Sequence, residues 1–564
     1  MRLPLFPSLA GYQRSWLNGD VVAGLTVWAV LVPEVLAYAS IAGVSPVVGL
    51  YAAPPALIFY AAFGSSRHLV VGPMSATAAL SAAVVADVAT DSSFAAMTAA
   101  LALATGAVAL LAGLARLGFL SNFISEPVLK GFIIGLALTI IIGQVPKLFG
   151  IPGGEGNFFE KAWDVIADLG DTSLTTLAVG ALSLAIVIGL RWVAPAVPGS
   201  LVAVAVGVLA VTLFDLDDHG VGIVGTIESG LPHVGRPDVS LSDTWTLVGS
   251  AVGVMLVGFA EGLGAAKTYA AREHYDIDAN RELLGLGAAN VGAGLSSGMV
   301  VNGSLSKTAV NGSAGARSQV SGLVVAALTV VTLLLLTGLF ENLPEATLAA
   351  VVIAAVVELV DIGALRELQR ASSRRLAAIY GVAARPDLIA SLAAMFGVLI
   401  FDTLPGLFIG IAVSLLLLVY RASRPNVAVL GQLPDDGRFA DVERFEDARP
   451  VPGVVVLRPE SGLFFANAEA VRARILAALA TGSPHAVVID AETMPYIDVT
   501  AIRMLDLLAA DVGRRGVTLA MARDVGQVRD LLNAAAHEGT VTRIYPTVRA
   551  AVAAVARPRG DAGG

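Results

Sequence analysis

Residues 302–308 read Asn-Gly-Ser-Leu-Ser-Lys-Thr, and residues 72–77 read Gly-Pro-Met-Ser-Ala-Thr. Each stretch opens a rather polar segment, 303–316 and 73–88, that is too short to cross a bilayer as a full helix. Gly or Pro interrupts the chain at the start of each segment. Short, interrupted segments in matching positions of two halves are typical of a binding site at the middle of a membrane. The two stretches therefore predict a pair of half-helices that begin inside the bilayer.

Long apolar runs flank both segments. A helix needs about 17–25 mostly apolar residues to span the hydrocarbon core. Such runs are expected to form spans at 20–43, 46–63, 94–115, 123–143, 174–192, 198–214, 244–266, 282–298, 318–340, 344–360, 377–400 and 404–421. With the two short segments the total is about 14 crossings.

The composition fits a membrane protein and excludes several functions. The 564 residues have a mean hydropathy of +0.77; 56% are hydrophobic and only 14% are charged. The net charge of −9 argues against nucleic acid as a partner. The sequence has no cysteine and no His/Cys cluster with metal-ligand spacing, so neither a metal nor a cofactor is expected. It also shows no nucleophile–base pair or phosphate loop, so an enzyme is not expected.

Charges in the gaps between spans orient the chain. With the N-terminus inside, the gaps on that side contain Arg14, Arg67, Arg116, Arg191, Lys267, Arg272, Arg281, Arg317, Arg366, Arg370, Arg374, Arg375, Arg421 and Arg424. The opposite gaps contain Asp87, Asp91, Glu155, Glu160, Asp164, Asp215, Asp217, Asp218, Glu228, Glu341 and Glu345. The few exceptions include Lys147, Lys161 and Arg236. Since cytoplasmic loops carry the excess of Lys and Arg, a multi-pass protein of the inner (plasma) membrane with both termini cytoplasmic is expected. This sorting holds only if both short segments count as crossings.

After Arg424 the sequence becomes that of a soluble domain. Strands are expected at 454–457, 486–489 and 517–522, and amphipathic helices at 466–480, 499–514 and 527–536. Alternating strands and helices predict a small α/β domain. The expected organisation is an N-terminal cytoplasmic segment (1–19), a transmembrane transport domain (20–424, with repeats at about 20–215 and 244–424), a linker (425–450), the soluble domain (451–557) and a disordered tail (558–564).

Lys307 is the residue that points to the cargo. It begins an otherwise uncharged segment and lies close to the hydroxyl groups of Ser304, Ser306 and Thr308. A cation at membrane depth is costly, so it usually has a partner or a function. The N-terminus of a half-helix adds unpaired N–H groups and the positive end of a dipole, which favours an anion. The alternative is that 303–316 is a loop in which Lys307 is merely solvated.

Glu34 and Glu261 are candidate sites for a coupling ion. Each lies within a predicted span, and a carboxyl group in a low-dielectric site can exchange a proton. Glu34 precedes Pro73 by 39 residues, and Glu261 precedes Ser304 by 43. The similar spacing predicts two related halves, inverted because an odd number of crossings separates them. The alternatives are a structural hydrogen bond at Pro33 for Glu34 and an interfacial ion pair with Lys267 for Glu261.

At these residues the sequence resembles the SulP (sulfate permease) family of anion transporters. The resemblance runs over nearly the whole chain and rests on several motifs in the same order. The motifs are 32–39, 42–46, 49–51, 64–68, 71–73, 304–308 and 315–319, with Asp490 and 497–501 in a tail that resembles a STAS domain.

The resemblance implies an inverted repeat of seven plus seven segments, divided into a core and a gate domain and usually assembled as a homodimer. It also implies that the anion binds between the N-termini of the third and tenth helices. Met74, Ser75 and Ala76 would then line one side, and Ser304, Ser306 and Lys307, followed by Thr308, the other. Glu34, Tyr38 and Glu261 would face the same cavity.

Three positions depart from the family pattern. Lys307 stands where the family commonly has Arg, and Lys lacks the planar fork that grips an oxyanion with two hydrogen bonds. Glu34 stands where many members carry Gln, whereas some bacterial members that resemble proton-coupled transporters carry Glu. Val499 stands where soluble STAS regulators often carry a phosphorylatable Ser, although Thr500 is adjacent.

These observations predict a secondary active transporter of a small inorganic or organic anion of the sulfate, bicarbonate or dicarboxylate class. H⁺ symport by an elevator-like motion is favoured, with Na⁺ a less favoured coupling ion. An uncoupled anion exchanger or a channel-like conductance is the alternative on the same scaffold. A membrane-anchored signalling protein is a third hypothesis, in which the tail acts on a cytoplasmic partner. Nothing in the sequence selects one anion.

Overall fold

A computed structural model of the chain describes residues 5–88, 94–119, 125–154, 156–194, 197–357, 360, 363, 366, 386–401, 403–480, 483–535 and 544–555. The chain divides into two units, Met1–Ser414 and Leu415–Gly564. Predictions made for Asp91, Glu155, Arg370, Arg374, Arg375, 377–385 and 558–564 lie outside the described residues.

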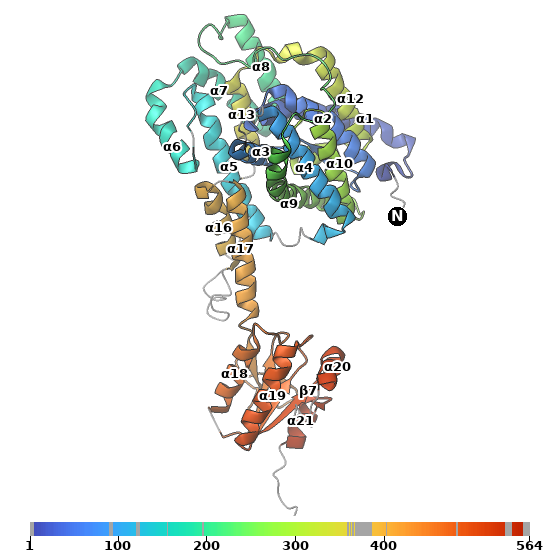
Figure 1. Cartoon of the computed structure of the whole chain (residues 1–564), viewed down its shortest axis with the longest axis vertical. Helices are drawn as coiled ribbons and strands as arrows, with labels where there is room; N and C mark the ends of the chain where they lie inside the picture. Colours follow the sequence, from blue (N-terminus) through green and yellow to red (C-terminus); the bar gives the residue numbers. More distant parts are fainter. Residues whose placement is uncertain are drawn as a thin grey trace, which may run out of the picture. The chain divides into compact units, whose positions relative to one another are not determined.

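The first unit is built of helices that begin and end close to the predicted spans (Figure 1). Within the described residues, eight helices are long and apolar enough to cross a membrane, and four shorter apolar helices accompany them. The helices are α1 (Leu17–Ile41), α2 (Pro46–Phe63), α3 (Ser75–Val88), α4 (Phe94–Leu114), α5 (Glu126–Phe149), α6 (Phe158–Ala167), α7 (Leu174–Val193), α8 (Gly199–Phe214), α9 (Leu241–Arg272), α10 (Ala279–Leu295), α11 (Leu305–Ser313), α12 (Val320–Val331), α13 (Glu345–Val357), α16 (Pro386–Phe401) and α17 (Thr403–Ala422), which runs into the second unit.

The helix α6 was not predicted. The Asn157 side chain accepts the backbone N–H groups of Phe159 and Glu160 at 2.9 and 3.1 Å, and the Glu160 carboxylate accepts the N–H of Asn157. This reciprocal pair is a capping box, which stabilises a helix start. A search for long apolar runs misses α6 because it is ten residues long and apolar on one side only.

Each predicted half-helix follows a short strand. β1 (Val70–Gly72) leads into α3, and β2 (Asn302–Ser304) leads into α11. The strands pair antiparallel with Val71 opposite Gly303, so α3 and α11 leave opposite ends of one two-stranded ribbon. The ribbon pairs backbone groups that an interrupted helix leaves open at membrane depth. The order helix, helix, strand, short helix thus occurs twice, while the inverted relation between whole halves stays a prediction.

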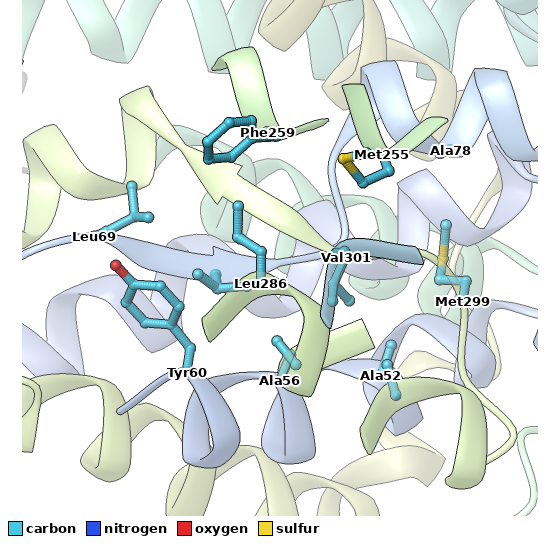
Figure 2. Packing of buried hydrophobic residues seen from close by; sticks show 14 of the residues in the cluster. Ala52, Ala56, Tyr60, Leu69, Ala78, Met255, Phe259, Leu286, Met299 and Val301 are labelled. Carbon is cyan, nitrogen blue, oxygen red and sulfur yellow. The ribbon is translucent and has the colours of Figure 1, made fainter. Parts of the chain in front are cut away.

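An apolar core surrounds the ribbon. Figure 2 shows Phe259 and Met255 of α9 on one side of it and Tyr60 of α2 on the other, with Leu286 of α10 beside Val301. These five side chains are at most 5% exposed. Lipid tails are as apolar as these groups, so close packing rather than transfer from water holds the core together.

Glycines allow α4 and α10 to approach closely. A Cβ atom at Gly106 of α4 would lie 2.7 Å from the carbonyl oxygen of Gly287 and 2.7 Å from the backbone nitrogen of Val291. Both neighbours are backbone atoms of α10, which cannot move aside as the end of a side chain can. The contact is an example of small residues at a membrane helix interface.

We expect Gly106→Ala to destabilise the membrane unit by about 1–3 kcal/mol, because the added methyl group forces α4 and α10 apart. The measurement is thermal unfolding of the purified protein in detergent. Gly249→Ala is the control, since Gly249 is an exposed residue of α9 and a Cβ atom added there would meet no atom within 4 Å. Equal melting temperatures for the two variants would contradict the close contact.

The second unit contains a six-stranded sheet in the order β4-β3-β5-β6-β7-β8, in which β5 to β8 run parallel. Helices α18, α19 and α20 supply side chains to the core on one face, and α21 supplies them on the other. The elements are β3 (Val427–Gln432), β4 (Phe439–Asp441), β5 (Val454–Pro459), α18 (Ala468–Ala480), β6 (Ala486–Asp490), α19 (Val499–Arg514), β7 (Thr518–Ala522), α20 (Gly526–Ala535), β8 (Ile544–Tyr545) and α21 (Val548–Val555).

The predicted linker at 425–450 is wrong for much of its length. β3 pairs with β5, with Leu430 opposite Val456, and β4 pairs with β3, so both strands belong to the sheet. The polar run that suggested a linker contains the connection between them, in which Gly437 adopts a φ of 65°. Such a left-handed conformation suits glycine in a tight turn. Turn residues were therefore mistaken for a boundary between domains.

Candidate functional site

A buried ion pair lies where α11 meets α1. The Nζ atom of Lys307 lies 2.7 Å from Oε2 of Glu34, and the two side chains are 1% and 12% exposed. The Lys307 ammonium also lies 4.9 Å from the centre of the Tyr38 ring, in cation–π geometry. Glu34 and Tyr38 are four residues apart on α1 and so share one face of that helix. The structure thus brings together three of the predicted site residues.

The start of α11 concentrates hydroxyl groups beside this pair. The Ser304 hydroxyl accepts the backbone N–H of Lys307 at 3.2 Å and lies 3.2 Å from the hydroxyl of Ser306. Ser304 therefore caps the helix, and the positive end of the α11 dipole adds to the charge of Lys307. The Thr308 hydroxyl is directed elsewhere, because it accepts the N–H of Val70 at 3.0 Å and ties α11 to β1.

The start of α3 supplies Met74, Ser75 and Ala76. Ser75 is 6% exposed and Ala76 1% exposed, whereas Met74 is half-buried. Both α3 and α11 pack against α1, so the helix that carries Glu34 lies beside both half-helices. This arrangement fits a site lined by the starts of α3 and α11, although the roles of individual residues stay a prediction.

A cavity of about 350 Å³ gives access to the ion pair from one side. Its walls come from α1 and α11 on one side and from α7, α8 and α13 on the other. Glu34 and Ser306 line it, and Arg191 at the end of α7 is the other charged residue on its wall. We call this cavity the vestibule. It lies beside Arg191, on the side that the charge count predicts to be cytoplasmic.

Glu261 lies away from the vestibule. The Nδ2 atom of Asn302 in β2 donates to its Oε2 atom at 3.3 Å, and Glu261 is not among the described residues that line the vestibule. The Oδ1 atom of Asn302 has no hydrogen-bond partner in the described chain. The structure therefore does not place Glu261 in the vestibule, and its place at the anion cavity stays a prediction. An ion pair between Glu261 and Lys267 is likewise absent from the described contacts.

The structure reveals a buried carboxylate that the sequence analysis missed. Glu282 of α10 is fully buried and accepts hydrogen bonds from the Tyr60 hydroxyl at 2.7 Å, from the Ser65 N–H and hydroxyl at 2.8 and 2.7 Å, and from the Ser66 N–H at 3.1 Å. It ties α10 to the loop after α2. The position of Glu282 at the start of an apolar span was the sequence feature that could have identified this buried carboxylate. The sequence analysis also gave no site role to Arg191 or Asn302. It used Arg191 only as a charge that orients the chain, and Asn302 only as the start of a segment.

The tail has its own buried carboxylate. Asp490, at the end of β6, is fully buried and accepts hydrogen bonds from Nε of Arg458 at 2.7 Å and from the guanidinium of Arg523. Asp498 caps α19 by accepting the N–H of Ala501 at 2.8 Å. Val499, the residue after it, is 65% exposed and offers no hydroxyl group for phosphorylation.

Comparison of the sequence with known families identifies two regions. The pattern of the sulfate permease family matches residues 17–382, and that of the STAS domain matches residues 447–551. A protein named a probable sulfate transporter from Mycobacterium tuberculosis (strain H37Rv) is 38% identical over 529 residues, which are 93% of this chain and 92% of that protein. High affinity sulfate transporter 1 of Stylosanthes hamata is 29% identical over 577 residues, which are 96% of this chain and 84% of that protein.

Solved structures show the same fold. The murine solute carrier 26 family member A9 anion transporter in the inward-facing state superposes with a TM-score of 0.88 at 22% identity, covering 98% of this chain and 94% of that one. The transmembrane domain of the cyanobacterial bicarbonate transporter BicA superposes with a TM-score of 0.61 at 22% identity, covering 71% and 98%. The predicted fold of a helical membrane domain followed by a STAS domain is confirmed.

Proposed function

The chain belongs to the sulfate permease family of membrane anion transporters, and we propose that it moves sulfate or a related small anion together with a proton. The observation that carries this proposal is the ion pair of Lys307 and Glu34 at the start of α11. Sulfate is the favoured cargo because the relatives that align over most of the chain are named sulfate transporters. Bicarbonate and dicarboxylates are the other candidates.

The ion pair sets a condition on anion binding. While Glu34 is ionised, its carboxylate neutralises the Lys307 ammonium at 2.7 Å and occupies the position that an oxyanion would take. Protonation of Glu34 removes that negative charge and leaves Lys307 with no countercharge in a nearly dry site. A bound anion then supplies the missing negative charge. The site therefore binds the anion and the proton together, because burying an uncompensated charge is costly.

Thermodynamic linkage makes this coupling reciprocal. If protonation of Glu34 strengthens anion binding by some factor, a bound anion favours protonation of Glu34 by the same factor. The 12% exposure of Glu34 toward the vestibule provides a route for the proton from water. Glu261, held by Asn302 outside the vestibule, is proposed as the alternative coupling residue, which would act through β2.

Alternating access is proposed to follow from the walls of the vestibule. α1 and α11 carry the ion pair on one wall, and α7, α8 and α13 form the other. Sliding the first group past the second would close this opening and expose the site on the opposite side. Arg191 on the second wall would draw anions into the opening. We further propose a homodimer in the plasma membrane with both termini in the cytoplasm.

The test is uptake into proteoliposomes that contain the purified protein. Radiolabelled sulfate, bicarbonate and a dicarboxylate are offered separately, with and without an inwardly directed proton gradient. We expect one anion, foremost sulfate, to accumulate several-fold above its equilibrium level when the gradient is present. Uptake that ignores the gradient but requires a counter-anion inside the vesicles would instead show an exchanger, and the role of Glu34 in coupling would be withdrawn.

A further inference from the structure

A second cavity in the membrane unit shares no lining residue with the vestibule. It has a volume of about 440 Å³ and lies beside the first turn of α1, the loop before β1, the end of α9 and the loop after α11. Its charged and aromatic lining residues are Arg67, Arg317, Glu273, His68, Tyr275 and Trp16. Residues from four separate segments thus converge on one pocket.

The arginines give this pocket an excess of positive charge. The Arg67 guanidinium lies over the Tyr275 ring at 5.4 Å, and within the described chain no carboxylate lies within ion-pair distance of it. Arg317 has only a long contact of 3.4 Å with Glu273, and its side chain is 58% exposed. Two guanidinium groups therefore face one carboxylate across the cavity, and both are accessible to a ligand.

Two other polar groups near the pocket, His68 and Asp20, are already engaged in hydrogen bonds. The ring of His68 lies 3.2 Å from the Tyr275 hydroxyl through Nδ1 and 3.1 Å from the carbonyl oxygen of Ala316 through Nε2. Burial lowers the pKa of His68, which disfavours a positive charge on its ring. The nearby carboxylate of Asp20 is fully buried and accepts the N–H groups of Arg317 and Ser318. Hydrogen bonds thus fix the orientation of these two side chains behind the arginines.

We propose that this cavity binds an anionic group of the phosphate class, held by Arg67 and Arg317. A guanidinium presents its N–H groups in a planar fork that matches two oxygens of a phosphate. Trp16 at the rim stacks edge-to-face with Tyr12, in the N-terminal segment next to the first span, and such aromatic residues collect at the membrane surface. The phosphate therefore comes either from a lipid headgroup or from free phosphate in the cytoplasm.

A bound phosphate would link the two halves of the chain. Arg67 belongs to the loop that leads into β1 and α3, whereas Arg317 belongs to the loop that leaves α11, two residues beyond Gly315. The ligand would bridge the segments next to both half-helices without entering the vestibule. The bound phosphate would therefore fix the positions of the two half-helices relative to each other. This proposal does not depend on the proposed proton coupling.

The experiment measures the melting temperature of the full-length protein in two arms. In detergent, inorganic phosphate is titrated at constant ionic strength; in vesicles, phosphatidylcholine alone is compared with phosphatidylcholine containing phosphatidylglycerol. We expect stabilisation in at least one arm, and the responding arm identifies the source. The double variant Arg67→Gln/Arg317→Gln should weaken the apparent affinity about tenfold or more, since two charge-assisted contacts are lost.

Two further variants make the result specific. Arg272→Gln, which removes an exposed arginine at the end of α9 outside the cavity, should respond as the wild type does. Lys307→Ala, which disables the transport site, should also keep the response. The proposal is overturned if neither arm responds, if the double variant keeps the response, or if Lys307→Ala abolishes it, because phosphate would then be bound at the transport site.

Discussion

Replacing Lys307 by alanine is expected to lower saturable anion uptake about 30-fold or more. Removing one partner of a buried, hydrogen-bonded charge pair typically costs about 2–5 kcal/mol of binding free energy, which sets the scale of the loss. Lys307 is 1% exposed, so bulk water does not replace its charge when the side chain is removed. The measurement is the concentration dependence of uptake into proteoliposomes.

Two variants distinguish a loss of anion binding in Lys307→Ala from a loss of the folded structure. Lys267→Ala removes an exposed lysine of α9 and should transport as the wild type does. Lys307→Arg keeps the charge and should retain a measurable part of the activity, with a changed affinity because the planar guanidinium has a different shape. If Lys307→Ala transports with unchanged affinity, then Lys307 does not bind the anion and the proposed site is wrong.

The positions of the spans could be predicted from the sequence because a bilayer fixes the length of an apolar helix. Residues 46–63 were predicted as a span and form α2, and 73–88 closely matches α3. The strands before α3 and α11 were not predicted, since three residues carry no period that separates a strand from a turn. Their pairing became visible only in three dimensions.

The partner of Lys307 could not be predicted from sequence alone. Lys307 and Glu34 are 273 positions apart, and both were assigned to the site for separate reasons: one as a countercharge for the anion, the other as a proton carrier. The structure shows that the two side chains bind each other. The family resemblance placed Glu261 at the same cavity, but a position in the sequence does not fix the direction of a side chain.

The contact between Lys307 and Glu34 links the two roles predicted for them, countercharge for the anion and carrier of the proton. A lysine without a carboxylate partner would bind an anion at any pH. A glutamate far from that lysine could affect anion binding only through other residues. Because the Glu34 carboxylate is bound to the Lys307 ammonium, the proposed mechanism places the loss of the carboxylate charge and the arrival of the anion at one position. In the proposed mechanism, one proton on Glu34 therefore frees one positive charge of Lys307 for the anion.

Glu34→Gln is expected to abolish accumulation driven by a proton gradient while leaving anion binding intact. The amide resembles the protonated carboxyl group in shape and has no charge, so Lys307 is left without a negative partner at every pH. In the proposed mechanism the anion binds the protein with Glu34 protonated, so the wild-type affinity for the anion is expected to be highest at low pH. The affinity should therefore fall as the pH rises. In Glu34→Gln the affinity should be independent of pH.

Uptake measured from acidic to alkaline pH in three variants decides which carboxyl group carries the proton. Glu126→Gln alters a 76% exposed carboxylate on α5 and should keep the wild-type slope, so it controls for the loss of a surface charge. Glu261→Gln tests the residue bound to Asn302. A flat profile in Glu34→Gln with a sloped profile in the other two assigns the proton to the ion pair. If Glu34→Gln keeps the slope and Glu261→Gln loses it, the proton is carried outside the vestibule, and the exchange of carboxylate for anion at Lys307 does not occur.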